Sequence, residues 1–161
     1  MFRSAEISGN NVNGHGKRPC KDRGGMNMTK TGGCLCGAVR YVIEGEPLMA
    51  AVCHCRNCQK QAGTAMSVLI GVRDEQISIT GELKTYEDRG ESGDPVWRRF
   101  CGHCGSPILS DLPSQQGLHF VKAGTLDDVS GLEPKLHFWT VSAQPWVRFA
   151  DDAVKFDRTP G

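Results

Sequence analysis

The sequence predicts a mostly β domain made of many short strands and little helix. Short runs rich in β-branched and aromatic residues recur along most of the chain, and polar or glycine-containing turns separate them. Apolar residues at helical spacing occur only in short pieces, and no repeat of about 20–50 residues is present. Seven of the eight cysteines fall into three tight clusters, which indicates turns that hold metal. The length of 161 residues suits one domain with a sizeable core.

Five strands are predicted in the first half of the domain. Each is a β-branched or aromatic run, and turns such as GEP (45–47) separate them. In chain order the strands are AVRYVIE (38–44), LMAAVC (48–53), MSVLIGV (66–72), QISIT (76–80) and ELKTYE (82–87).

Three more strands are predicted after the loop DRGESGDP (88–95). The run VWRRFC (96–101) alternates as a strand with one exposed face does, and it is followed by SPILSDL (106–112) and GLHFVKAG (117–124). Short helices are predicted only at residues 56–62 and 125–130.

Residues 1–28 differ in composition from the rest of the chain. They are rich in glycine and asparagine, and they contain too few apolar side chains to offset the entropy lost on ordering. We therefore predict a disordered leader over residues 1–28 and a zinc-binding domain over residues 29–161. Cys20 lies in the leader, and we expect it to be a free thiol without a function.

Charge and hydropathy exclude several classes of function. The net charge is +1, and residues 1–28 contribute +3, so the remaining 133 residues carry −2. A domain that binds nucleic acid usually presents a basic face, so no nucleic-acid partner is expected. No apolar run approaches the roughly 20 residues of a membrane helix, and the first residues lack the apolar block of a secretory signal. We expect a cytoplasmic protein with no membrane partner, whose cysteines are metal ligands before they are disulfides.

The clustered cysteines have the spacing of zinc ligands. Glycines at 102 and 105 permit the tight turn of a zinc knuckle, and closely spaced thiolates can converge on one ion at about 2.3 Å. Seven ligands divide naturally into a set of four and a set of three. Four cysteines form a closed structural site, whereas three leave one position open for chemistry. The clusters are CLC (Cys34, Cys36), CHCRNC (Cys53, Cys55, Cys58) and CGHC (Cys101, Cys104).

Spacing alone leaves two partitions open. Cys55 and Cys58 could join Cys101 and Cys104 in a CxxC-plus-CxxC ribbon. Alternatively, the two isolated pairs could join and leave the triplet intact. The second partition is favoured by loop-closure entropy, because the three triplet cysteines are close in sequence.

Four motifs resemble the glutathione-dependent formaldehyde-activating enzyme family, which is related to centromere protein V. They are GGCLCGAVRY, CHCRNCQKQAGTAMS, FCGHCGSPI and HFWTVSAQPW, which follow one another between Gly32 and Trp146. The resemblance implies a β-tent fold of antiparallel strands with two zinc ions. It places structural zinc on Cys34, Cys36, Cys101 and Cys104, and a second zinc on Cys53, Cys55 and Cys58.

The resemblance also implies an activity like that of S-(hydroxymethyl)glutathione synthase. Such an enzyme is a carbon–sulfur lyase that acts on glutathione, or a related small-molecule thiol, and formaldehyde. The open position of a three-cysteine zinc suits this chemistry, because zinc accepts thiolate ligands readily. We therefore predict Cys53, Cys55 and Cys58 as the catalytic residues. The alternative is a binding module in which both zinc ions are structural, which would require a fourth protein ligand at the triplet.

The sequence also predicts where several residues near the triplet lie. His54 lies between two ligands, so its side chain should point away from the ion. Arg98 and Arg99 should lie on opposite faces of a strand, so at most one of them lines a cleft. We expect Trp139 and Trp146 to be core residues.

Overall fold

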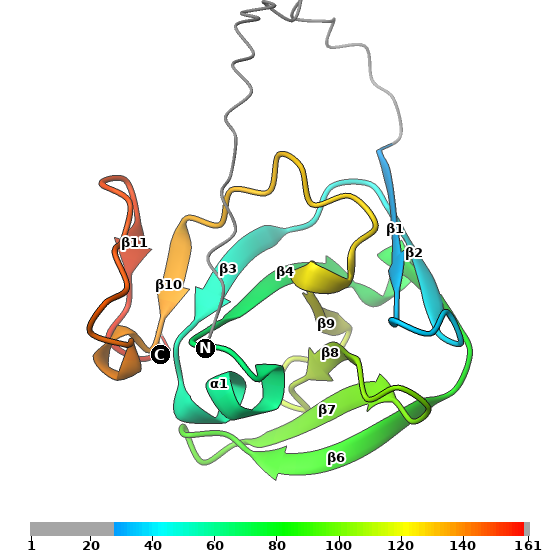
Figure 1. Cartoon of the computed structure of the whole chain (residues 1–161), viewed down its shortest axis with the longest axis horizontal. Helices are drawn as coiled ribbons and strands as arrows, with labels where there is room; N and C mark the ends of the chain where they lie inside the picture. The colour runs from blue at the N-terminus through cyan, green and yellow to red at the C-terminus, as the bar shows by residue number, and fades with distance from the viewer. Residues whose placement is uncertain (1–27, 160–161) are drawn as a thin grey trace, which may run out of the picture.

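The computed structural model describes residues 28–159 as two open β-sheets with little helix, which confirms the mostly β fold (Figure 1). The leader predicted over residues 1–28 lies outside the described residues except for Met28. Among the described residues, no helix is long and apolar enough to span a membrane.

The smaller sheet has three antiparallel strands in the order β1-β2-β5. They are β1 (Thr29–Gly33), β2 (Arg40–Glu44) and β5 (Ile77–Thr80). Strand β1 was not predicted, because TKTGG contains no apolar residue. Its five residues nevertheless pair with five residues of β2, so the backbone of this neighbour makes it a strand.

The larger sheet has eight strands in the order β11-β10-β3-β4-β9-β8-β7-β6. Six of them were predicted to within a few residues. The strands are β3 (Met49–Cys53), β4 (Ser67–Arg73), β6 (Leu83–Arg89), β7 (Pro95–Cys101), β8 (Pro107–Asp111), β9 (Leu118–Lys122), β10 (Leu136–Phe138) and β11 (Val154–Lys155). The two short strands β10 and β11 were missed. The expectation of antiparallel pairing is wrong for them, because β10 pairs parallel with both β3 and β11.

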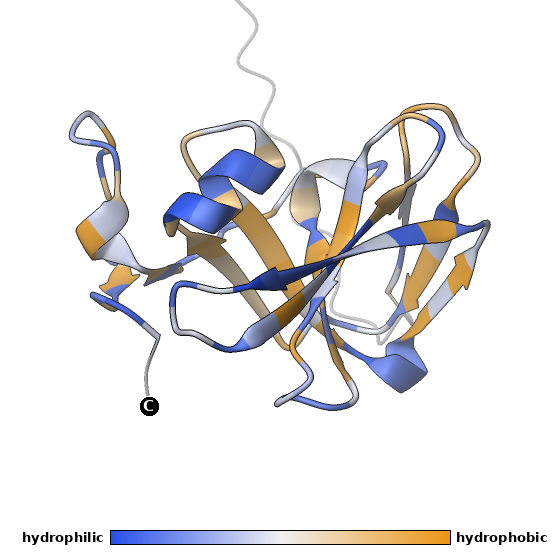
Figure 2. Ribbon diagram, turned by 90° about the horizontal axis from the view of Figure 1, so that it is seen from below, coloured by the Kyte–Doolittle hydropathy of each residue, from blue (hydrophilic) through white to orange (hydrophobic). Residues whose placement is uncertain are grey.

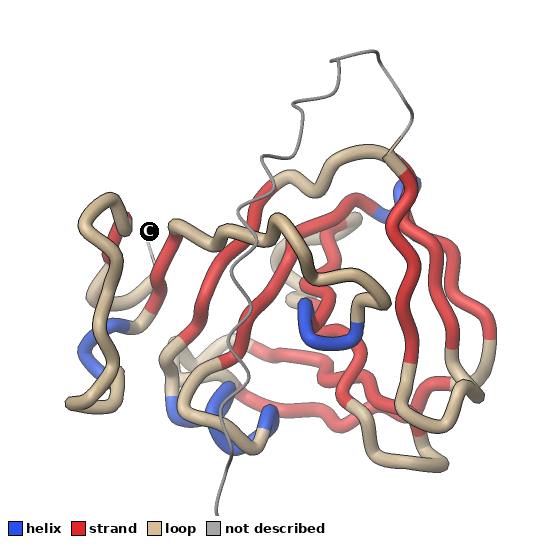
Figure 3. The backbone as a smooth tube through the Cα atoms, turned by 45° about the horizontal axis from the view of Figure 1, so that its top comes forward, coloured by secondary structure: helices blue, strands red, loops and turns tan. Residues whose placement is uncertain are grey.

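The helices are few and short, as Figure 3 shows. The predicted helix at 56–62 is α1 (Arg56–Ala62), and Gly63 ends it in the left-handed region at φ 66°. Three-residue 3₁₀ turns occur at η1 (Asp74–Gln76), η2 (Ala123–Thr125) and η3 (Thr140–Ser142).

The helix predicted at 125–130 is absent, and a loop follows η2. The side chains of this segment bind groups that a helix would not bring to them. The Asp127 carboxylate accepts hydrogen bonds from Thr31 and Arg40, and Asp128 accepts one from the backbone N–H of Ser130. Aspartate side chains that bind nearby backbone and strand groups in this way compete with helix formation.

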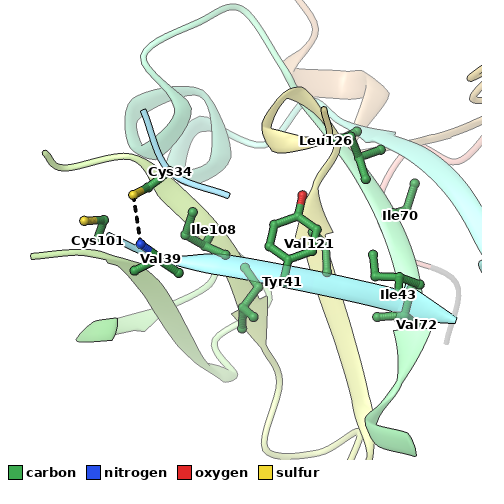
Figure 4. Packing of buried hydrophobic residues seen from close by; sticks show 12 residues of the cluster. Cys34, Val39, Tyr41, Ile43, Ile70, Val72, Cys101, Ile108, Val121 and Leu126 are labelled. Carbon is green, nitrogen blue, oxygen red and sulfur yellow. Dashed lines mark hydrogen bonds between the residues drawn. The ribbon is translucent and has the colours of Figure 1, made fainter. Parts of the chain in front are cut away.

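The hydrophobic core lies between the two sheets (Figure 4). The burial of β2 alternates, so that Tyr41 and Ile43 are buried while Val42 is exposed. These two side chains pack with buried residues of the larger sheet, namely Ile70, Val72, Ile108, Leu109 and Val121. Burying each such side chain contributes about 1.5–3 kcal/mol to folding, so this layer holds the two sheets together. Trp139 and Trp146 were both predicted to be core residues. Trp139 is buried, as predicted, but Trp146 is 65% exposed.

The opposite face of the larger sheet collects polar and sulfur-bearing side chains. Residues directly opposite each other on paired strands point to the same face. The register pairs Cys53 with Ser67, Leu69 with Lys122, Phe120 with Ser110, and Ser110 with Arg98. We call this surface the site face. Figure 2 shows the contrast between the hydrophobic stretches of the strands and the hydrophilic α1.

Candidate metal centre

Four cysteines from two distant turns form the first cluster. Cys34 and Cys36 lie in the turn between β1 and β2, Cys101 ends β7, and Cys104 lies in the turn before β8. All four sulfur atoms lie within 4.8 Å of one another. The Sγ atoms of Cys34 and Cys36 are 3.5 Å apart, and those of Cys36 and Cys101 are 3.8 Å apart. Four thiolates placed tetrahedrally at about 2.3 Å from zinc would stand ~3.8 Å apart, so this donor set fits zinc.

The turns of the first cluster are built to hold thiolates. The backbone N–H of Val39 donates a hydrogen bond to the Cys34 sulfur at 3.2 Å. Gly37 and Gly105 adopt the positive φ values of 79° and 77° that these knuckles require. Hydrogen bonds from the side chain and backbone of Ser106 lower the pKa of Cys104 to about 5. A thiolate is the form that a metal ion needs.

The second cluster consists of Cys53, Cys55 and Cys58. Cys53 ends β3, Cys55 is the N-cap of α1, and Cys58 lies in the first turn of that helix. Their sulfur atoms also lie within 4.8 Å of one another, and all three residues are buried. The Cys55 sulfur accepts the hydrogen bond of the Cys58 backbone N–H at 3.3 Å, as an N-cap side chain does. The cysteines therefore group as four and three, and the ribbon partition is not the one formed.

The surroundings of Cys58 favour its ionised form more than those of Cys53 do. Hydrogen bonds from the thiols of Cys53 and Cys55 lower the pKa of Cys58, and the nearby charges of Lys122 and Arg98 lower it further. The corresponding hydrogen bonds to Cys55 and Cys58 raise the pKa of Cys53. Among the three thiols, Cys58 is therefore the one whose surroundings most favour the thiolate form.

Two buried cations lie beside the second cluster. Arg98 is 4% exposed; it donates to the Cys58 sulfur at 3.7 Å and to the Asp88 carboxylate at 2.7 Å. Lys122 is 5% exposed and donates to the Ser67 hydroxyl at 3.1 Å. Burial lowers the pKa of Lys122, while the charge of Cys58 opposes this shift. A divalent ion with three thiolates carries −1, but the charges of Arg98, Asp88 and Lys122 bring the local sum to zero.

The histidine between Cys53 and Cys55 takes no part in either cluster. His54 is fully buried and stacks on His137, with its Nε2 atom 3.0 Å from the Nδ1 atom of His137. The edge of Phe149 closes this stack. Burial lowers the pKa of both His54 and His137, so both rings are neutral near pH 7. His54 was expected to point away from an ion at the triplet, and it is not among the side chains that could hold one there. Within residues 28–159, no histidine or carboxylate completes the triplet as a fourth donor.

The triplet opens into a cavity of about 280 Å³ on the site face. Its wall is mostly apolar and includes Leu69, Phe120 and Trp139. Trp139 is the one non-glycine residue of the described chain with positive φ, at 59°. Such a conformation persists only where the surroundings enforce it, and it often marks a functional site. The polar side chains of the wall include Arg98, Ser110, Gln115 and Lys122.

The sequence identified some of these lining residues and missed others. Arg98 lines the cavity, while Arg99 pairs with Asp111 at 2.8 Å outside it, which confirms that only one of the two faces the cleft. Lys122 and Ser110 were missed. The available signal was the alternation of GLHFVKAG, which places a lysine on the same face as Phe120 in a strand otherwise fit for burial.

Comparisons with known proteins identify one family and one similar fold. Residues 29–142 match the family described as "Glutathione-dependent formaldehyde-activating enzyme". The fold is similar to the crystal structure of a protein from Rhodobacter sphaeroides, with a TM-score of 0.50 and 21% sequence identity. The alignment covers 63% of this chain and 91% of that one. No curated protein matches the sequence.

Proposed function

Since the chain belongs to the glutathione-dependent formaldehyde-activating enzyme family, we propose that it is a zinc-dependent carbon–sulfur lyase. Its reaction would join glutathione, or a related thiol, to formaldehyde, as in S-(hydroxymethyl)glutathione synthase, and would cleave the same bond in reverse. The single observation that carries this proposal is that three buried cysteines, without a fourth protein donor among the described residues, face a cavity.

The two clusters would have different tasks. Cys34, Cys36, Cys101 and Cys104 would bind a structural zinc, because four thiolates leave no position for a substrate. Cys53, Cys55 and Cys58 would bind a second zinc. When bound there, zinc supplies a Lewis acid with one free position that can hold a substrate sulfur as thiolate.

The protein side chains around the triplet suit a visiting thiol. Arg98 and Lys122 offset the negative charge of the three cysteines, so a fourth anionic sulfur can approach. The apolar wall limits the water that could compete with the thiol. Arg98 is held in place by Asp88 and would keep the Cys58 thiolate ionised and oriented.

Turnover should be measured as the exchange between glutathione and its formaldehyde adduct. We expect the zinc-loaded protein to accelerate this exchange at least about a hundredfold over the spontaneous reaction, since positioning of a bound nucleophile alone can lower a barrier by several kcal/mol. Exchange NMR with ¹³C-formaldehyde measures both directions at equilibrium. Heat-denatured protein with the same zinc content is the control. No acceleration, together with two closed metal sites, would favour the binding-module alternative.

We further propose that residues 29–161 suffice for this function. Met28 contributes its backbone carbonyl, which accepts a hydrogen bond from Gly45 at 2.9 Å, at the edge of the smaller sheet. A chain that begins at Met28 should therefore keep the unfolding midpoint, the metal content and the exchange rate of the full chain. Loss of metal or a lower midpoint on truncation would show that the leader belongs to the domain.

A further inference from the structure

Two buried polar side chains on the site face have hydrogen-bonding capacity that the protein does not use. The ammonium of Lys122 has three protons, and among residues 28–159 its one hydrogen-bond partner is the hydroxyl of Ser67. Ser110 is 5% exposed, and its hydroxyl has no partner in the same part of the chain. Buried polar groups in folded proteins are normally satisfied. Both side chains line the cavity into which the triplet opens.

The strand register brings these two groups to the sulfur end of the cavity. Ser67 lies directly across from Cys53, so the hydrogen bond to Ser67 holds the Lys122 ammonium near that ligand. Ser110 pairs with Phe120, two residues before Lys122, and therefore lies on the same face beside it. Arg98 is opposite Ser110, but its guanidinium is already engaged by Asp88 and Cys58.

The cavity wall limits the kind of ligand that could accept hydrogen bonds from Lys122 and Ser110. The rest of the cavity is lined mainly by aliphatic and aromatic side chains. A positive donor and a hydroxyl together select a small oxygen acceptor that carries or develops negative charge. In the proposed reaction such an atom lies one carbon away from the sulfur.

We propose that Lys122 and Ser110 form an oxygen-binding subsite that donates hydrogen bonds to the aldehyde oxygen during adduct formation. This inference rests on the proposed function. In the forward step the thiolate sulfur forms a bond to the aldehyde carbon, and the π electrons of the C=O bond move to oxygen. The resulting R–S–CH₂–O⁻ oxygen takes a proton from solvent, which balances the proton that the thiol released on ionising. Ser67 is a positioning residue, because it acts through Lys122.

Thiol affinity tests this subsite without turnover. With cobalt at the triplet, a bound thiol adds a sulfur-to-metal absorption band that can be titrated. The probes are 2-mercaptoethanol and 1-propanethiol, which have nearly the same shape but end in a hydroxyl and a methyl group, respectively. The hydroxyl oxygen of 2-mercaptoethanol lies one carbon farther from the sulfur than the oxygen of the adduct, and the flexible lysine side chain can follow it. We expect the intact protein to prefer 2-mercaptoethanol by about tenfold, the worth of one charge-assisted hydrogen bond.

The variants Lys122→Met and Ser110→Ala should each reduce this preference toward one. Loss of the Lys122 charge weakens the binding of both thiolates alike, so the ratio of the two affinities isolates the hydrogen bond to the hydroxyl. Methionine keeps the length of the lysine side chain without its donor, and zinc content and the unfolding midpoint of the variant show that the site is intact. Lys135→Gln is the matched control, because Lys135 is exposed and pairs with Asp152. Equal affinities for both probes in the intact protein, or an unchanged preference in Lys122→Met, would overturn the subsite.

Steady-state kinetics tell whether Lys122 donates to the aldehyde oxygen or only binds a carboxylate of glutathione. A donor to the developing oxyanion should lower kcat by about a hundredfold in Lys122→Met, beyond any rise in KM that follows from the lost positive charge. A raised KM with an unchanged kcat would mean that Lys122 binds a carboxylate of glutathione, which also overturns the subsite. The proposed function itself fails if neither thiol adds the sulfur-to-metal band and if the exchange between glutathione and its formaldehyde adduct is not accelerated. The subsite then fails with it.

Discussion

Replacing Cys101 with serine should unfold the domain near room temperature. The sulfur of Cys101 is buried in the four-cysteine cluster, which joins the turn between β1 and β2 to the turn between β7 and β8. A metal ion there would connect the two sheets across more than 60 residues of chain. Binding of structural zinc contributes about 10–16 kcal/mol in small zinc domains, which is as large as the whole stability of a typical domain, about 5–15 kcal/mol. Thermal unfolding followed by circular dichroism, with zinc content measured on the same sample, checks this expectation.

The matched control is Cys55→Ser. Serine is a favourable N-cap residue, so it can replace the hydrogen bond that the Cys55 sulfur accepts at the start of α1. This variant should lose the second zinc but keep the unfolding midpoint within a few degrees of the parent. Equal loss of stability in the two variants would remove the distinction between a structural and a catalytic site.

Removal of a triplet sulfur should abolish thiol binding and turnover while the fold persists. Cys53→Ala, Cys55→Ala and Cys58→Ala each leave two thiolates, which hold a metal ion poorly. With cobalt in the intact protein, glutathione should add a sulfur-to-metal band at the triplet and leave the four-cysteine site unchanged. Each variant should lose this response, and the exchange rate should fall to that of the uncatalysed reaction.

Two controls accompany this experiment. Cys20→Ala removes the thiol of the predicted leader and should change neither the band nor the rate. S-methylglutathione keeps the carboxylates of glutathione but has no thiol, so it should fail to produce the band. A cobalt response that survives in a triplet variant would show that glutathione binds elsewhere.

Local pattern predicted the strands that face the core. β2, β3, β4, β8 and β9 carry β-branched residues at strand spacing, and the sequence located them to within two residues or so. β1, β10 and β11 were missed because β1 has no apolar residue and the other two have only three and two residues. Their strand character comes from neighbours that are distant in sequence, and local propensity does not contain that information.

Some features of the candidate site could likewise be predicted from local sequence, and others could not. The clustering of the cysteines could be predicted because their spacing is local, and so could the absence of His54 from the triplet, because it lies between two of its cysteines. The cavity depends instead on the register between strands that are far apart in the chain. Lys122 faces the triplet only because β9 pairs with β4, and Ser110 reaches the same cavity only through β8. Without knowledge of the strand register, the sequence shows only that Lys122 and Ser110 lie in two ordinary strands.

The central claim is that the second metal keeps one coordination position for a substrate sulfur. X-ray absorption at the zinc edge measures this most directly, on the full chain loaded with two zinc ions, before and after glutathione is added. Seven cysteine sulfurs shared by two ions give an average of about 3.5 sulfurs per zinc at about 2.3 Å. We expect this average to rise to about 4 with glutathione, because its sulfur takes the position that the protein leaves open. An average that does not change with glutathione, with both ions already closed by protein ligands, would contradict the account.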